Sequence, residues 1–466
     1  MKIVFVTALL LLGQVALAQD CDCSSQFTFV KDYYEQNSPA FQKIKNDAQE
    51  YGQYLKKVNQ LTKSIAKEKS GDRCNVYFEQ YVTLLKDHHS SVDINLKRLD
   101  IDIKDEAQLK RFKNSKAYQA FRKIPLDTTA LMAQLCTKPL NALEGLYTNG
   151  GSLHIGIIKE KKNHYIGVVL KKTQFVDVGH VLLEFKQKEA DTFESTYYLG
   201  LLGFNFQSVY NTIEIKNGKI PNYGFSKLNE PGNQKEDVKP YEFKVLDAQT
   251  NYLRLSDFDG SLKAELNAFY ESIARDLSSK PYLVIDLRDN GGGDERCYFN
   301  LMPYLYTKPL TVDNVEVWVS PENIKRYEEA AGKNTTLIER MKQAQPYTFI
   351  PQVENAVNTW KLDSSTVYPR KVAVLFNRKT ASSAEGLITY AMQSDKVITV
   401  GENSGGFIGY GNVMQTVTPC GNYILRCTTT KYTNNSKYEF VGIEPTHKVK
   451  SNVDWIEFTQ SLFKNL

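Results

Sequence analysis

Two hydrophobic periods divide the first half of the chain. Between residues 25 and 130, apolar side chains recur at helical spacing with Lys, Gln and Glu between them, and the pattern stops near Pro125. From residue 142 to about 220 the period changes to two, which is typical of half-buried strands. The expected strands cover 153–157, 165–170, 181–185, 197–202 and 213–215, the last running into a turn at 216–219. We therefore expect a helical region followed by a small antiparallel β domain.

The second half of the chain alternates strands and helices. An apolar strand at 252–255, an amphipathic helix at 262–277 and a strand at 282–287 come first, then helix and loop over 301–370. A strand at 372–376, a helix from 381 to about 393 and a strand at 397–400 follow. Strand, helix, strand predicts parallel neighbours. The expected division of the chain is 1–18 signal peptide, 19–135 helical region, 136–222 β domain, 223–240 linker and 241–466 α/β domain.

The first residues have the pattern of an export signal. Lys2 supplies a positive start, residues 3–12 are apolar, and Ala16-Leu17-Ala18 is a small-residue cleavage site. The apolar run is too short to span a bilayer. No other stretch is apolar enough for a membrane span, so we expect a secreted or periplasmic protein cleaved after Ala18. The net charge of +5 over 466 residues, without a basic tract, gives no support for nucleic-acid binding.

Seven cysteines follow the cleavage site, and an exported chain can form disulfides. Cys420 and Cys427 flank a Gly-Asn turn and are the expected pair. Cys21 or Cys23 with Cys74 is a further possibility, and the odd total leaves at least one cysteine unpaired or joined to another chain. Cys21-Asp22-Cys23 lacks zinc spacing, and we expect no metal site.

Polar residues that carry chemistry lie at three places. Ser382 and Ser383 stand where the helix after the strand at 372–376 begins, beside unpaired backbone N–H groups, although a serine there is more often only an N-cap. Residues 288–294, Arg-Asp-Asn-Gly-Gly-Gly-Asp, follow a buried strand, where glycines allow the backbone to approach a ligand. His88 and His89 end an apolar-periodic helix, where a surface role is the ordinary reading.

Together these segments resemble one family. Thr-Ala-Ser-Ser-Ala-Glu at 380–385, Leu-Arg-Asp-Asn-Gly-Gly-Gly at 287–293 and Asp-His-His-Ser at 87–90 are similar to the C-terminal-processing (tail-specific) serine peptidases, which include the tricorn core. Val-Gly-Ile-Glu-Pro at 441–445 resembles the closing segment of that family. The resemblance covers about residues 245–450 and implies a crotonase/ClpP-like α/β catalytic domain in a multidomain chain.

The resemblance also implies roles for single residues. Ser382 matches the nucleophile, and the N–H groups of Ser383 and of the turn containing Gly291 and Gly292 would form the oxyanion hole. The bacterial enzymes take their base from a lysine about 25 residues beyond the serine, but here Phe407 stands in that place. The branch similar to the tricorn core uses a histidine instead.

In that branch His89 matches the base, with His447 in reserve, and Glu439 matches the orienting glutamate, with Glu444 second. A hydroxyl residue of the branch corresponds to His88. The PDZ domain usual in the family is not recognisable: Gly-Leu-Leu-Gly-Phe at 200–204 resembles its loop only superficially. The small β domain is the candidate to replace it, so recognition of substrate C-termini does not follow.

The expected function is that of a secreted or periplasmic serine endopeptidase that hydrolyses protein or peptide substrates through an acyl-enzyme on Ser382, without metal or organic cofactor. The alternative is a non-catalytic peptide- or ligand-binding protein on the same scaffold, since a fold does not determine a function. An enoyl-CoA-type enzyme on the related fold is disfavoured by the export signal. Oligomeric state and substrate preference do not follow from the sequence.

Overall fold

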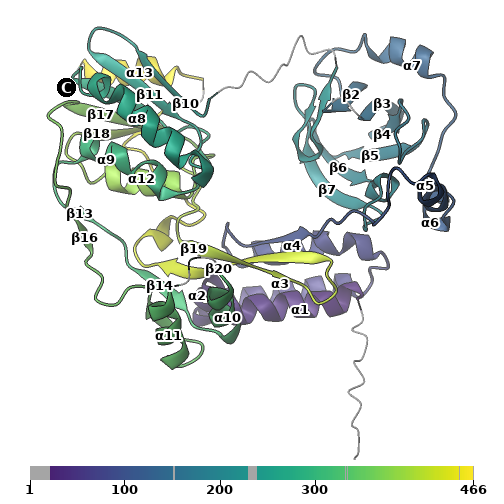
Figure 1. Ribbon diagram of the computed structural model, residues 1–466, viewed down its shortest axis with the longest axis horizontal. Coiled ribbons are helices and arrows are strands. Elements are labelled where there is room, and N and C mark those ends of the chain that lie inside the picture. The colour runs from purple at the N-terminus through teal and green to yellow at the C-terminus, as the bar shows by residue number, and fades with distance from the viewer. Residues whose placement is uncertain are drawn as a thin grey trace, which may run out of the picture.

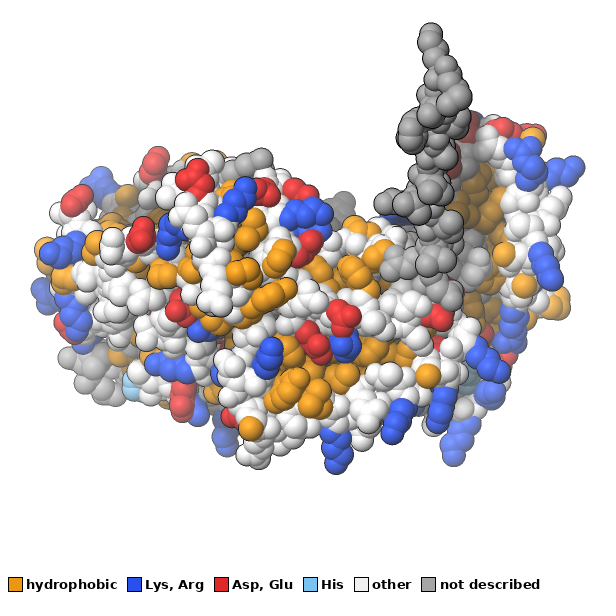
Figure 2. All heavy atoms as spheres, turned by 90° about the horizontal axis from the view of Figure 1, so that it is seen from below, with side chains coloured by type: hydrophobic (Ala, Val, Ile, Leu, Met, Phe, Trp, Pro, Cys, Tyr) orange, Lys and Arg blue, Asp and Glu red, His pale blue; other side chains and the backbone are white. Residues whose placement is uncertain are grey.

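The computed structural model describes residues 21–150, 153–228, 239–330, 332, 334–450 and 452–464. The expected signal peptide and its cleavage site lie outside the described residues, as does most of the expected linker. None of the described helices is long and apolar enough to cross a bilayer. On the face seen from below in Figure 2, basic and acidic side chains are interspersed with apolar ones, in keeping with the small net charge.

The chain begins with four packed helices: α1 (Cys23–Asn37), α2 (Pro39–Asn46), α3 (Ala48–Ile65) and α4 (Cys74–Thr83). Side-chain caps separate α1, α2 and α3: Ser38 Oγ accepts from Phe41 N, and Asp47 Oδ1 accepts from the first amides of α3. The Tyr34 hydroxyl, fully buried, donates to the carbonyls of Ser91 and Arg426. These contacts join α1 to two segments that lie much later in the chain.

Helix does not continue through the whole of the expected region. Residues 84–90 form a loop, β1 (Ser91–Ile94) is a strand, and three short helices follow: α5 (Glu106–Lys113), α6 (Lys116–Gln119) and α7 (Thr128–Leu135). β1 pairs antiparallel with β20 (Tyr423–Tyr432), more than 300 residues later. This strand was not expected because its partner is so distant in sequence.

The β domain is one antiparallel sheet of eight strands in the order β7-β6-β5-β4-β3-β2-β9-β8. Its strands are β2 (Gly145–Asn149), β3 (Leu153–Lys161), β4 (His164–Val169), β5 (Val181–Gln187), β6 (Thr192–Tyr197), β7 (Val209–Glu214), β8 (Lys219–Ile220) and β9 (Phe225–Lys227). The antiparallel expectation is confirmed. In Figure 1 the domain stands apart from the α/β domain that follows it in the chain, with helices α1 to α4 below both and α5, α6 and α7 beside the β domain.

Two details of this domain differ from expectation. The strand expected at 197–202 ends at Tyr197 and is followed by a 3₁₀ turn, Leu199–Leu202, closed by Gly203 in the left-handed region at φ 76°. The expected linker contains β9, so the domain extends past residue 222. Lys227 at the end of β9 is 4% exposed, and its ammonium donates to the Pro139 carbonyl at 2.7 Å, an anchor that composition alone does not reveal.

The catalytic domain is built on a six-stranded sheet in the order β10-β11-β12-β17-β18-β21. Its strands are β10 (Tyr241–Val245), β11 (Thr250–Leu255), β12 (Tyr282–Asp286), β17 (Lys371–Phe376), β18 (Val397–Gly401) and β21 (His447–Lys448). All pairs except β10 with β11 are parallel, which confirms the parallel sheet.

Helices cover both faces of this sheet. Leu283 and Ile285 of β12 pack with α8 (Lys263–Leu277), α9 (Met302–Leu305) and α12 (Ser383–Ala391), whereas Val284 packs with α13 (Trp455–Phe463). Fully buried strands with helices on both sides explain the continuous apolar runs in the sequence. The observed layers agree with the expected α/β fold.

A second sheet connects this domain to the helical region. β20 pairs with β19 (Tyr410–Val417) along one edge and with β1 and β14 (Val315–Trp318) along the other, and β14 also pairs with β15 (Phe349–Pro351). Helices α10 (Pro321–Glu329) and α11 (Thr335–Gln343) pack on β14, and β13 (Leu310–Thr311) pairs with β16 (Thr359–Trp360). The strands between 301 and 370 were expected as helix and loop.

Two disulfides join distant segments: Cys21 with Cys420, and Cys23 with Cys74. The second agrees with one of the two possibilities for Cys74. The expected Cys420–Cys427 pair is wrong, because Cys420 lies in the turn after β19 while the Cys427 thiol points from β20 into the core formed with the first helices. Among the described residues, Cys136 and Cys297 also take part in no disulfide.

Replacing both Cys23 and Cys74 by alanine should lower the free energy of unfolding by about 3–4 kcal/mol, because the bond closes a loop of 51 residues in the unfolded chain. Urea unfolding in non-reducing buffer measures this loss. Cys136→Ala is the matched control and should change stability little. A double variant that unfolds at the same urea concentration as the natural protein would contradict the expectation.

Candidate active site

Ser382 stands at the junction between the turn after β17 and helix α12. Its backbone has φ 54° and ψ −122°, a conformation that a non-glycine residue adopts only when its surroundings impose it. The Ser382 N–H donates to Glu385 Oε2 at 2.9 Å, as in the S-x-x-E capping box. The serine hydroxyl is turned toward the Nε2 atom of His89, at 3.3 Å. Ser382 is therefore more than a helix cap.

Glu385 holds the backbone around Ser382. Its carboxylate is fully buried and accepts four hydrogen bonds: Oε2 from the amides of Ser382 and Phe407, and Oε1 from the Ser404 hydroxyl at 2.5 Å and the Gly406 amide at 2.8 Å. One side chain thus connects the serine turn to the loop at 404–407. The sequence motif contained this glutamate, but its role required the structure.

His89 comes from the loop between α4 and β1. Buried Asp87 orders that loop: Oδ1 accepts from the His89 amide at 3.0 Å, and Oδ2 accepts from the hydroxyls of Ser90 and Thr428, both at 2.6 Å. Burial lowers the pKa of His89 below its ordinary value of 6.5, against the opposing effect of the Asp87 charge. The imidazole next to Ser382 is accordingly neutral near pH 7.

The other histidine of the pair has a structural environment. The His88 ring stacks on Phe407 and Phe440, with centroids 4.2 and 3.7 Å apart, and its Nδ1 lies 2.9 Å from the Gly406 carbonyl. Glu439 accepts from the His88 amide at 3.0 Å and from the Gly409 amide at 2.7 Å. Burial raises the pKa of Glu439 to about 7. The Glu439 carboxyl therefore binds the backbone of the histidine loop. Among the described residues it makes no hydrogen bond to the His89 ring.

The two second-choice residues lie elsewhere in the catalytic domain. Glu444 is exposed and pairs with Lys448. His447 belongs to β21, opposite Val400 of β18. Neither makes a hydrogen bond to the Ser382 hydroxyl, whose histidine partner within the described chain is His89.

The glycine turn lies directly against the serine turn. β12 and β17 are parallel neighbours, so both turns emerge at the same sheet edge, and Ala381 N donates to the Asn290 carbonyl at 2.9 Å. A Cβ on Gly292 would lie 2.7 Å from Ser382 Cβ and 2.9 Å from Ser383 N, and Gly292 has φ 92°. Only glycine permits this close approach.

Within the turn, the amides are used differently. Gly292 N–H donates to Asn290 Oδ1 at 2.9 Å, so that donor is occupied. Gly291 is exposed, with nothing within 4 Å of the position of a Cβ. The N–H groups of Gly293 and Ser383 donate to no acceptor within the described residues, and both residues line the pocket beside Ser382. The geometry thus favours Gly293 over Gly291 and Gly292 as the partner of Ser383.

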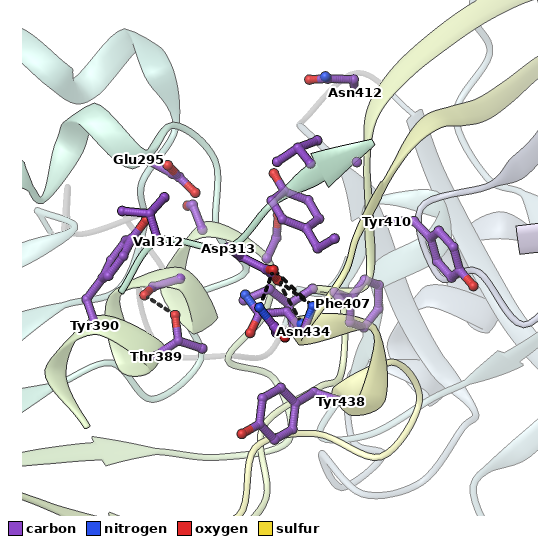
Figure 3. Close-up of a pocket in the computed structure, with 18 of the residues that line it drawn as sticks. Glu295, Val312, Asp313, Thr389, Tyr390, Phe407, Tyr410, Asn412, Asn434 and Tyr438 are labelled. Carbon is purple, nitrogen blue, oxygen red and sulfur yellow. Dashed lines mark hydrogen bonds between the residues drawn. The ribbon is translucent and has the colours of Figure 1, made fainter. Parts of the chain in front are cut away.

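A pocket of about 1070 Å³ opens next to Ser382 and His89. Figure 3 shows Tyr390, Phe407, Tyr410 and Tyr438 around it, from helix α12, the loop before β19, β19 itself and the segment after β20. The Phe407 ring lies edge-on to His89, with centroids 5.7 Å apart, and restricts the space around the imidazole.

Residues 249–449 match the model of Peptidase family S41. This part of the chain is a Peptidase family S41 domain. This domain contains Ser382, the glycine turn and Glu439, whereas His89 reaches the S41 domain from the helical region. The resemblance stated for residues 245–450 is thereby confirmed.

No curated protein matches the chain. Among solved structures, a candidate peptidase from Parabacteroides merdae ATCC 43184 is 18% identical, over 48% of this chain and 64% of that one, with a TM-score of 0.31. The photosystem II D1 C-terminal processing protease is 14% identical, over 92% and 94%, with a TM-score of 0.37. Mature CPAF complexed with lactacystin is 11% identical, over 96% and 97%, with a TM-score of 0.48. The match to the Parabacteroides structure spans less than two thirds of that chain.

The loss of activity at low pH should reflect protonation of His89. Because the pKa of His89 is lowered, its neutral form persists to lower pH, and kcat/KM should rise with pH through a midpoint below 6.5. A pH profile with a peptide substrate measures this midpoint. Glu439→Gln tests this assignment, because the midpoint of the activity loss should stay at the same pH without the Glu439 carboxyl. A midpoint near pH 7 that disappears in Glu439→Gln would assign the titration to Glu439 instead.

Proposed function

We propose that the chain is a secreted or periplasmic endopeptidase in which Ser382 is the nucleophile and His89 the general base. The observation that carries this proposal is the 3.3 Å separation between Ser382 Oγ and His89 Nε2, made by residues 293 positions apart. A serine hydroxyl is a weak nucleophile without such a base. The neutral state of the imidazole near pH 7 and the pocket beside it also support the proposal.

The reaction proceeds through an acyl-enzyme. Ser382 Oγ attacks the carbonyl carbon of the scissile bond while His89 Nε2 takes the hydroxyl proton. The N–H groups of Gly293 and Ser383 donate to the oxygen that becomes negative. His89 then gives the proton to the leaving amine, and the C–N bond breaks. Water, activated by the same imidazole, hydrolyses the ester and restores the serine.

The residues around His89 support our proposal that the enzyme belongs to the branch that uses histidine rather than lysine. Phe407 occupies the position of the lysine. Asp87 holds the backbone of His89, and the Phe407 ring packs edge-on against the imidazole. Glu439 acts as a positioning residue, since it binds the backbone of the histidine loop and of Gly409. His88, in place of a hydroxyl residue, clamps the loop by stacking between two phenylalanines.

Export is supported by two observations. The first 18 residues have the pattern of a signal peptide, and two disulfides join distant segments. The substrate class is protein or peptide, as the match to Peptidase family S41 implies, and the pocket beside Ser382 offers the space for it.

A fluorophosphonate probe, which reacts only with activated serines, tests the proposal. We expect covalent labelling of the purified chain at Ser382, located by mass spectrometry of tryptic peptides, and loss of the label in Ser382→Ala. Ser272→Ala, an exposed serine on α8, is the matched control and should be labelled like the natural protein. Absence of labelling at any pH, with peptides still bound, would favour the non-catalytic binding protein on the same scaffold.

A further inference from the structure

The pocket continues from Ser382 along one face of helix α12. Ser383, Gly386 and Tyr390 lie on this face. Gly386 has no side chain, and a Cβ there would lie 3.0 Å from the Tyr298 hydroxyl and 3.4 Å from Glu295 Oε1. A polar site is therefore formed above Gly386, next to the proposed nucleophile.

The negative charge of Glu295 has no partner in the described chain. The adjacent Arg296 is paired with Asp294, and the Lys437 ammonium, at the pocket wall, lies 4.9 Å over the Tyr438 ring. Desolvation, and then the charge of Asp294, raise the pKa of the Glu295 carboxyl. A carboxylate in such surroundings is stabilised when a cation binds beside it.

Phenol groups accompany this carboxylate. The Tyr298 hydroxyl is fully buried and has no hydrogen-bond partner among the described residues. Burial, followed by the Glu295 charge, raises the pKa of Tyr390 to about 12, and both also act on Tyr432. Figure 3 shows Glu295 and Tyr390 on the same side of the pocket. A carboxylate beside aromatic rings is the combination that binds an alkylammonium or guanidinium group.

We propose that Glu295 binds the cationic side chain of the substrate residue next to the scissile bond, so that the enzyme cleaves beside lysine or arginine. This inference rests on the proposed function. Ser382 and Gly386 are four residues apart, about 6 Å along a helix, which the four-carbon stem of lysine can span. The aromatic walls contact that stem, and Glu295 pairs with the charge.

Cleavage mapping tests the inference without assuming a sequence. The natural protein is incubated with a peptide library derived from a proteome, and the new termini are identified by mass spectrometry. Lysine and arginine should be enriched on one side of the cleaved bonds. Peptides with lysine or the uncharged norleucine at that position should then differ in kcat/KM by about tenfold or more, the effect of one charge-assisted hydrogen bond.

Variants at Glu295 separate charge from shape. Glu295→Gln should remove the preference for lysine over norleucine while cleavage of the norleucine peptide continues, and Glu295→Lys should favour a glutamate at the same position. Glu271→Gln, an exposed glutamate on α8, is the matched control and should keep the preference for lysine.

The outcomes distinguish this inference from the proposed function. Cleavage without enrichment of lysine or arginine, or a lysine preference that survives in Glu295→Gln, would overturn the inference and leave the peptidase intact. Absence of both cleavage and probe labelling at Ser382 would overturn the proposed function and the inference with it.

Discussion

Removing the Ser382 hydroxyl or the His89 imidazole should reduce kcat for peptide hydrolysis by roughly 10⁴- to 10⁶-fold, and removing both should cost little more. The reason is that neither group works without the other: the hydroxyl needs a proton acceptor, and the imidazole has no nucleophile to activate. Ser382→Ala, His89→Ala and the double variant are compared with a fluorogenic peptide, and circular dichroism verifies the fold.

Two other histidines serve as controls for this experiment. His447→Ala should keep its activity, because His447 lies in β21 and makes no hydrogen bond to the serine. His88→Ala should lose less than His89→Ala, since it removes stacking and leaves the base in place. Loss of activity in His447→Ala with full activity in His89→Ala would contradict the assignment of the base.

Replacing Glu385 by glutamine should lower both stability and activity. The fully buried carboxylate accepts four hydrogen bonds. An amide offers one acceptor oxygen, and its NH2 group faces either the N–H groups of Ser382 and Phe407 or the Gly406 N–H with the Ser404 hydroxyl. We expect a loss of about 3–5 kcal/mol in the free energy of unfolding, because buried donors lose a charged acceptor. Urea unfolding measures it.

Activity in the same variant should fall at least about 100-fold where protein remains folded, since the strained backbone of Ser382 depends on Glu385. Glu271→Gln, on the surface of α8, is the matched control for both measurements. An unchanged unfolding midpoint with full activity would show that the serine turn keeps its conformation without this carboxylate.

The regular parts of the fold could be predicted because their patterns are local. The α8 and α12 helices, the strands β12, β17 and β18 and their parallel pairing follow from hydrophobic spacing and from the βαβ rule. An antiparallel β domain was expected from its period of two, although not the number of its strands, which is eight. The strands β1, β14 and β15 were missed, since short strands with distant partners have no pattern of their own.

The tertiary structure also determined which cysteines form disulfides with each other. A turn signal favoured Cys420 with Cys427, yet Cys420 bonds to Cys21, 399 residues away. Disulfide connectivity depends on which Cβ atoms meet, and spacing along the chain does not specify it.

For the site, the sequence by itself determined the residue types: a serine at a helix start, glycines after a buried strand and a histidine pair. Only the tertiary structure decided that His89 rather than His88 or His447 meets Ser382, that Asn290 occupies the Gly292 amide, and that Glu439 binds a backbone instead of the imidazole. The physical reason is that a hydrogen bond depends on separation and direction in space. Those quantities arise when the helical region, the glycine turn and β20 pack together, and no short segment contains them.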